Sequence, residues 1–153
     1  MLSIRTAARA LIVREGRVLL TRCLRDGMEF YLLPGGGQSP GESLRETVAR
    51  ECREEIDTEV EVGALRFVRD YIPSEGGPSY LSEAPHQVEH VFLCRVPEDY
   101  RPAEGGEPDS SQVGVEWVAI DQVPPLRVYP DWLMASLQAE EQDSLPVYQG
   151  VEG

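Results

Sequence analysis

The chain has 153 residues, 41% of them hydrophobic, and its 14 basic and 27 acidic residues give a net charge of −13. Its apolar runs are too short to cross a bilayer, and its acidic surface repels the backbone of polymeric nucleic acid, so a membrane and DNA or RNA are excluded as expected partners. All of the basic residues are arginines, which excludes Schiff-base chemistry and a Walker-type phosphate loop, because both need lysine.

The N-terminal segments predict strands followed by a glycine-rich loop. Thr6–Val13 and Arg17–Leu24 are β-like runs separated by a Glu-Gly turn, which predicts a hairpin. Phe30–Leu33 predicts a short strand that ends before a proline. The stretch PGGGQSPGE that follows predicts an irregular loop.

A helix is predicted to begin after this loop. Ser43 and Glu46 have the spacing of a capping box, in which each side chain satisfies a backbone N–H of the other residue. Leu44, Val48 and Cys52 recur at every fourth position and give the helix one apolar stripe. This stripe is expected to pack on a sheet.

The rest of the chain predicts further strands, two long loops and a closing helix. The expected strands are Val60–Ile72 (one strand or two), Val88–Val96 and Val115–Ala119; the loops are Pro73–Pro85 and Pro97–Gln112; the helix is Pro130–Glu140. Loops of that length shape a binding site or are mobile. The order of elements predicts an α/β fold in one domain over residues 1–153, with a mixed sheet and helices packed on it.

The predicted first helix carries three acids on one face. Glu51, Glu54 and Glu55 lie within an arc of roughly 100° on an α-helix. Like charges so spaced destabilise a helix unless a hard cation such as Mg²⁺ occupies the site. The alternative is a solvated acidic face balanced by Arg50 and Arg53.

The glycine-rich stretch before the helix favours the cation site. Gly35, Gly36 and Gly37 allow the backbone to approach a metal ion or a phosphate closely. An ordinary strand-to-helix turn would also explain them. Followed by the acid cluster, they indicate a phosphate-processing site.

These segments together closely resemble the Nudix box, GX5EX7REUXEEXGU. The match runs from Gly36 through Glu42 to the segment Arg50–Glu55, and every charged position of the pattern is filled at the right spacing over 23 residues. The sequence departs from the box at Asp57 and Thr58, where the pattern has glycine and an aliphatic residue. Because Asp tolerates left-handed backbone, we expect the helix end to be preserved.

The resemblance implies a fold, a reaction and a set of roles. The fold would be the Nudix α/β/α sandwich with a mixed central sheet, and the reaction would be hydrolysis of a phosphoanhydride bond. Mg²⁺, or Mn²⁺ as the alternative, would be held by the carboxylates of Glu51, Glu54 and Glu55 and the main-chain carbonyl of Gly35. Arg50 would orient the acids and Glu42 would brace the loop, so that Arg50, Glu51 and Glu54 act directly in catalysis.

The general base is left open by the sequence. The resemblance implies either a box glutamate, here Glu51, or an acid from a later strand or loop. Glu89 is the first candidate outside the box, and Glu83 and Glu116 are the next candidates. The alternative for Glu89, which the sequence supports equally, is an exposed residue of a strand.

The substrate class follows from the box, but the group X attached to the nucleoside diphosphate does not. Backbone at Gly36 and Gly37 and the side chains of Arg22 and Arg69 are candidate phosphate contacts; for both arginines, a surface charge is the alternative. Pro73 resembles the downstream proline of ADP-ribose-type members, although a proline that begins a loop needs no such explanation.

Three hypotheses therefore remain. The leading one is a Mg²⁺-dependent pyrophosphohydrolase of ADP-ribose-like or related nucleoside diphosphate derivatives, and its enzymatic rival is a nucleoside triphosphate pyrophosphohydrolase that sanitises the nucleotide pool. A non-catalytic nucleotide-binding sensor of the same fold is the third. Three scattered cysteines and no evident targeting segment favour the cytoplasm, and a homodimer is possible.

Overall fold

The computed structural model describes residues 3–73, 85–121, 127–139 and 145–152. Two helices and ten strands lie in these ranges. In chain order they are β1 (Ile4–Leu11), β2 (Val13–Arg14), β3 (Arg17–Arg25), β4 (Met28–Leu32), β5 (Gly35–Gly37), α1 (Leu44–Ile56), β6 (Glu61–Tyr71), β7 (His86–Arg95), β8 (Gln112–Ala119), β9 (Val128–Tyr129), α2 (Leu133–Gln138) and β10 (Tyr148–Glu152).

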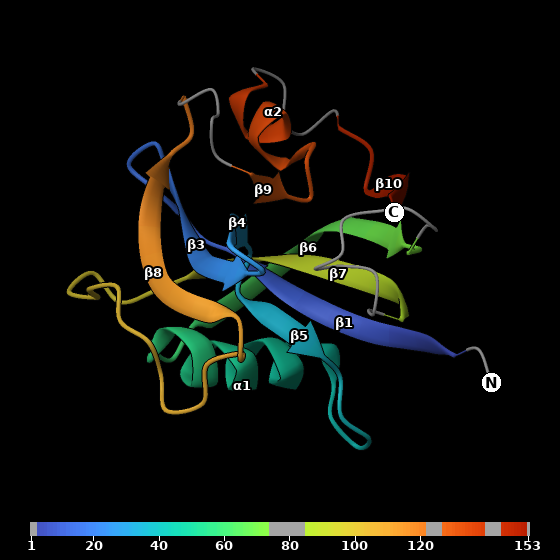
Figure 1. Cartoon of the computed structure of the whole chain (residues 1–153), viewed down its shortest axis with the longest axis horizontal. Coiled ribbons are helices and arrows are strands. Elements are labelled where there is room, and N and C mark those ends of the chain that lie inside the picture. The colour runs from blue at the N-terminus through green and yellow to red at the C-terminus, as the bar shows by residue number, and fades with distance from the viewer. Residues whose placement is uncertain (1–2, 74–84, 122–126, 140–144, 153) are drawn as a thin grey trace.

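The strands form two curled five-stranded sheets. The first has the order β10-β6-β7-β1-β5, and the second has the order β2-β3-β4-β9 with β8 paired to β3. Strand β7 pairs in parallel with β1 and antiparallel with β6, so the first sheet is mixed as predicted. Helix α1 lies on one side of the strands and α2 on the other, next to β9 (Figure 1). The α/β/α sandwich is confirmed, with two sheets in its central part.

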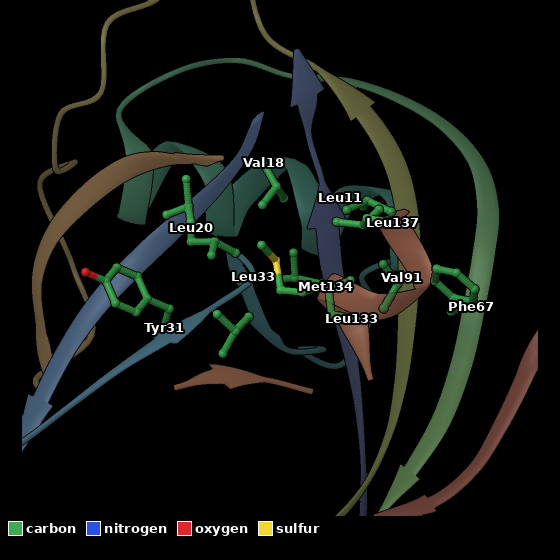
Figure 2. Packing of buried hydrophobic residues seen from close by; sticks show 12 residues of the cluster. Leu11, Val18, Leu20, Tyr31, Leu33, Phe67, Val91, Leu133, Met134 and Leu137 are labelled. Carbon is green, nitrogen blue, oxygen red and sulfur yellow. The ribbon is translucent and has the colours of Figure 1, made fainter. Parts of the chain in front are cut away.

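Two apolar clusters hold these layers together. Figure 2 shows the first, in which the α2 side chains Leu133, Met134 and Leu137 pack against residues of β1, β3, β6 and β7. The second lies under α1, where Val48 and Cys52 are fully buried with apolar residues of β1 and β3. The predicted stripe of α1 is therefore the surface that fixes the helix to the sheets.

Both ends of α1 are formed as predicted. The Ser43 hydroxyl accepts a hydrogen bond from the N–H of Glu46 at 3.1 Å, and the Glu46 carboxylate accepts one from the N–H of Ser43 at 3.4 Å. At the other end, Asp57 adopts the left-handed conformation with φ of 58°. The acid that replaces the glycine of the box thus ends the helix in the same way.

The predicted hairpin is correct only at its tip. Residues Val13 and Arg14 pair with the start of β3, but β1 leaves this sheet and pairs with β7 and β5. The prediction of an irregular loop is wrong for Gly35–Gly37, because these residues form the strand β5 against Ala7–Arg9 of β1. Both errors arise from pairing between segments that are distant in sequence, which local patterns do not encode.

The C-terminal part also differs from the prediction. The closing helix is shorter than Pro130–Glu140 and covers Leu133–Gln138. Strands β9 and β10 were not predicted, and each is added in parallel to the edge of a sheet. Most of the predicted loop Pro73–Pro85 lies outside the described residues. No helix in the described ranges has the length and apolarity of a membrane span.

Candidate active site

A cavity of about 390 Å³ opens between α1, β5 and β1. Five carboxylates line it, three from α1 and two from the loop before β8: Glu51, Glu54, Glu55, Glu107 and Asp109. The other lining residues are Arg5, Arg9, Gln87 and the three glycines of β5. The three acids that the sequence placed on one helical face therefore share one cavity, which we call the acidic pocket.

The glycines of β5 form one wall of the acidic pocket, and each leaves room for a different group. A Cβ at Gly35 would overlap the backbone of Ala8, and a Cβ at Gly37 would overlap the guanidinium of Arg5. At Gly36, a Cβ would lie 2.7 Å from Oε1 of Glu51. The glycines thus allow Glu51 and Arg5 to lie directly against the backbone of the strand.

Arg50 connects the acids of α1 to the loop before it. Its guanidinium donates to both oxygens of Glu42 at 2.7 and 3.0 Å and to the carbonyl oxygen of Gly37 at 3.0 Å. It also donates to Glu51 Oε1 at 3.0 Å and to Glu54 Oε2 at 3.2 Å. The hydrogen bonds that Glu42 accepts from Arg50, and also from Ser39 and Thr47, lower the pKa of Glu42 to about 2. Arg50 therefore contacts Glu42, Glu51 and Glu54 at once, and the roles expected from the resemblance for Arg50 and Glu42 stay predictions.

Glu55 is the most buried acid of the pocket, with 7% of its surface exposed. Its Oε2 accepts a hydrogen bond of 2.8 Å from the N–H of Gly35. Burial raises the pKa of Glu55 to about 8, and burial also raises the pKa of Glu51. Both carboxyls are costly to ionise in the absence of a compensating positive charge.

The acid set fits a hard divalent cation. Within the described part of the chain, Glu51 Oε2, Glu54 Oε1 and Glu55 Oε1 accept no hydrogen bond, so each side chain keeps one oxygen available. In the same part, no three or more acid, histidine or cysteine side chains lie close enough together to hold a metal ion as they stand. Since like charges repel, a cation would be needed to draw the carboxylates together.

Glu89 lies on β7 and is not among the described residues that line the pocket. Its Oε2 accepts from Arg69 at 2.7 Å and its Oε1 from Arg9 at 3.3 Å. Burial alone would raise the pKa of Glu89, but the two arginines lower it. Arg9 also donates to the carbonyl oxygens of Leu33 and Gly35, each at 3.0 Å. Glu89 therefore holds Arg9 against β5.

The remaining predicted residues lie elsewhere. Arg22 is on β3, where it contacts Glu29 at 3.2 Å and Glu116 at 3.7 Å, and it does not line the pocket. Arg69 lies behind Glu89, so neither predicted arginine reaches the pocket wall. Glu83 lies outside the described residues.

Several pocket residues were not predicted from the sequence. Arg5 and Gln87 become neighbours only through the parallel pairing of β1 with β7. The acids of the loop reach the pocket because the N–H of Glu107 donates to the carbonyl oxygen of Glu54 at 3.2 Å. Gly105 permits this contact, since a Cβ there would overlap the backbone at the end of α1.

Comparisons with known proteins identify the family and the fold of the chain. Residues 3–135 match the NUDIX domain family. A nucleoside triphosphatase NudI of Enterobacter sp. (strain 638) is 35% identical over 95 residues, which cover 59% of this chain and 67% of that protein. The crystal structure of a MutT NUDIX hydrolase from Burkholderia pseudomallei is 27% identical, with a TM-score of 0.65 over 90% of this chain and 99% of that one. An ADP-ribose pyrophosphatase from Streptococcus suis shares the fold at 21% identity, with a TM-score of 0.61 over 96% and 97% of the two chains.

Proposed function

The chain belongs to the NUDIX domain family, and we propose that it is a Mg²⁺-dependent hydrolase. Its substrate would be a nucleoside diphosphate linked to another group, as in ADP-ribose, and the bond that it cleaves would be the phosphoanhydride bond. Hydrolase chemistry is common to this family and its named relatives. The observation that carries the proposal is the convergence of three box glutamates and two loop acids on one pocket beside a glycine strand. An acidic pocket can bind a phosphorylated ligand only when cations bridge the two sets of negative charge.

The cation would be held by the free oxygens of Glu51, Glu54 and Glu55 and by the carbonyl of Gly35. These are hard oxygen donors, which suit Mg²⁺ and also Mn²⁺. When bound, such a cation polarises the phosphate and lowers the pKa of a coordinated water molecule. Glu107 and Asp109, from the loop before β8, also line the pocket and supply further oxygen donors.

We assign the proton transfer to Glu51. Burial raises its pKa, and only Oε1 is engaged by Arg50, so Oε2 can receive a proton from the attacking water when the cation is held by Glu54, Glu55 and the carbonyl of Gly35. Glu89 is less suited to this role, because both of its oxygens are held by arginines and its pKa is lowered. Its proposed role is to position Arg9 and, through it, the carbonyl of Gly35.

A nucleoside triphosphate pyrophosphohydrolase is the second candidate function. It is favoured by the similarity to the protein named nucleoside triphosphatase NudI. The two candidate functions would use the same acids, and they differ in the group that is released when the bond is cleaved. A triphosphate would yield pyrophosphate and a nucleoside monophosphate, whereas a diphosphate derivative would yield a monophosphate and a phosphorylated X group.

A nucleotide panel separates the two functions. The purified protein would be incubated with Mg²⁺ and either nucleoside diphosphate sugars or nucleoside triphosphates, and the products would be identified by chromatography and mass spectrometry. We expect cleavage between the two phosphates of the diphosphate derivatives, and no cleavage in EDTA. Full turnover in EDTA, or in a Glu54→Gln variant, would contradict the proposal.

The proposed setting is the cytoplasm, with a small-molecule nucleotide as the partner. Cys23, Cys52 and Cys94 are free and buried, which suits a reducing compartment. The homodimer considered in the sequence analysis stays a prediction, as does a single domain over residues 1–153.

A further inference from the structure

A second cavity of about 560 Å³ lies between the start of β1 and the loop that joins β5 to α1. We call it the outer cavity. Arg5 lines both the outer cavity and the acidic pocket, so its side chain stands where the two meet. Any ligand that extends from the carboxylates into the outer cavity must therefore pass this guanidinium.

Arg5 differs from the other two arginines around the acidic pocket. Arg9 and Arg50 donate to backbone carbonyls and carboxylates of the fold. The Arg5 side chain, in contrast, makes no hydrogen bond or ion pair with any residue that the structure describes. Its guanidinium lies over Gly37, whose missing side chain leaves the space for it. A guanidinium with uncommitted donors beside a cation site is suited to bind phosphate with two parallel hydrogen bonds.

The outer cavity has the chemistry of a site for a hydroxylated group. Its polar lining includes Thr6, Gln38 and Ser39, which offer hydroxyl and amide groups. The carboxylate of Glu42 is also there, but it is already bound by Arg50, Ser39 and Thr47. None of the described lining residues is aromatic, so the cavity presents no ring on which a nucleobase could stack.

We propose that Arg5 binds a phosphate of the substrate at the junction of the two cavities, and that the outer cavity takes the sugar attached to that phosphate. The inference rests on the proposed function, because the acidic pocket must hold the diphosphate. It adds that X is a sugar, and that Arg5 and the outer cavity select for it. Arg5 is a substrate-binding residue in this scheme and takes no part in proton transfer.

The role of Arg5 is tested by binding as well as by turnover. An ADP-ribose analogue with a methylene group between its phosphates cannot be cleaved there, and its affinity with Mg²⁺ can be measured by calorimetry. We expect Arg5→Gln to weaken this affinity about tenfold to a hundredfold, as for the loss of a charged hydrogen-bonding group, and Arg5→Lys to restore part of it. For ADP-ribose, the KM should rise while kcat changes little.

Arg17→Gln is the matched control. Arg17 is an exposed arginine at the start of β3, and its side chain has no hydrogen bond or ion pair to the described residues. This variant removes the same charge from the molecule, and it should bind the analogue like the parent. Equal weakening by Arg5→Gln and Arg17→Gln would show a general charge effect and overturn the role of Arg5.

The sugar site is tested by filling the outer cavity. In Ser39→Trp, an indole would occupy the cavity, while the backbone bonds of residue 39 to Glu42 could remain. We expect this variant to weaken binding of methylene-bridged ADP-ribose and to leave binding of methylene-bridged ADP, which lacks the second sugar, unchanged. An equal effect on both ligands, or no effect on either, would overturn the sugar assignment.

The failure of this inference differs from the failure of the proposed function. If the parent hydrolyses nucleoside diphosphate sugars with Mg²⁺ but Arg5→Gln and Ser39→Trp behave like the parent, only the inference is overturned. If the parent hydrolyses nucleoside triphosphates alone, both the sugar site and the leading function are overturned, and the family chemistry remains.

Discussion

Glu55 combines two properties that oppose each other in the metal-free protein. Its side chain is buried against β5, where it accepts a hydrogen bond from Gly35, and burial raises its pKa to about 8. To hold a cation, however, the carboxylate must be ionised. Without a cation the carboxyl stays protonated below about pH 8, and a bound divalent ion would favour its ionised form.

This opposition predicts how Glu55→Gln changes the free energy of unfolding. The pKa of Glu55 in the folded protein is above its usual value of 4.5. The contribution of the protonated side chain to the free energy of unfolding is therefore complete below pH 4.5, and it is lost as the pH rises to about 8. Gln does not titrate and can still accept from Gly35. At pH 8 without metal, the variant should be more stable than the parent by on the order of 3 kcal/mol, and at pH 4.5 the two should be equal.

Denaturant unfolding at both pH values, in EDTA, measures this difference. Glu61→Gln is the control, because Glu61 is an exposed acid on β6. Addition of Mg²⁺ at pH 8 should reverse the order of parent and variant, because the parent alone keeps the complete ligand set. A Glu55→Gln variant that is less stable than the parent at pH 8 in EDTA would show that the buried charge is already compensated.

The assignment of the general base predicts different results for Glu51→Gln and Glu89→Gln. Loss of the base should lower kcat by about 10²- to 10⁴-fold, so we expect this for Glu51. Glu89→Gln should mainly lower stability, because it leaves Arg9 and Arg69 without their buried counter-charge. Kinetics and thermal unfolding of both variants check this. A folded Glu89→Gln protein as inactive as Glu51→Gln would reverse the assignment.

At the scale of elements, α1 could be predicted in detail and β5 could not. The capping box, the apolar stripe and the left-handed Asp57 are local features of the sequence, and the structure contains all three. The glycine strand depends on pairing with Ala7–Arg9, which lies more than a full strand away in the chain. No local pattern predicts this pairing, because three glycines show no alternation of apolar and polar side chains from which a strand could be recognised.

The C-terminal end of α1 offers a prediction about stability. Asp57 has φ of 58°, a conformation that costs a residue with a side chain more than it costs glycine. Asp57→Gly should therefore stabilise the protein by about 0.5 kcal/mol, after the greater chain entropy of glycine is subtracted. Asp57→Ala should destabilise it by about 1 kcal/mol. Chemical unfolding gives both values, and the opposite order would mean that the Asp57 side chain supports the helix end.

The glycine strand offers a prediction about activity. In Gly36→Ala, the added Cβ would meet the carboxylate of Glu51 at 2.7 Å, so the carboxylate must shift away from β5 and from its present position beside Arg50. We expect a loss of turnover of about 100-fold with little change in the far-ultraviolet spectrum. Gly106→Ala is the control, because a Cβ there meets no atom within 4 Å. Full activity of Gly36→Ala would show that Glu51 need not approach β5.

At the scale of the whole molecule, the pocket is assembled from parts that the sequence does not connect. The helix acids come from one segment, Arg5 and Gln87 from two paired strands, and Glu107 and Asp109 from a loop that docks on the end of α1. The chemistry of the helix acids could be predicted, because these residues lie close together in the sequence at a fixed helical spacing. The other parts could not, because only the folded arrangement of both sheets and α1 brings them together.

The most direct test of this account is anomalous diffraction from crystals grown with Mn²⁺. Manganese scatters anomalously and accepts the same oxygen ligands as Mg²⁺. The account predicts an anomalous peak in the acidic pocket, within bonding distance of the Glu51, Glu54 and Glu55 carboxylates, and its absence in Glu55→Gln crystals treated in the same way. An acidic pocket without manganese in the parent, or manganese bound only at another site, would contradict the account.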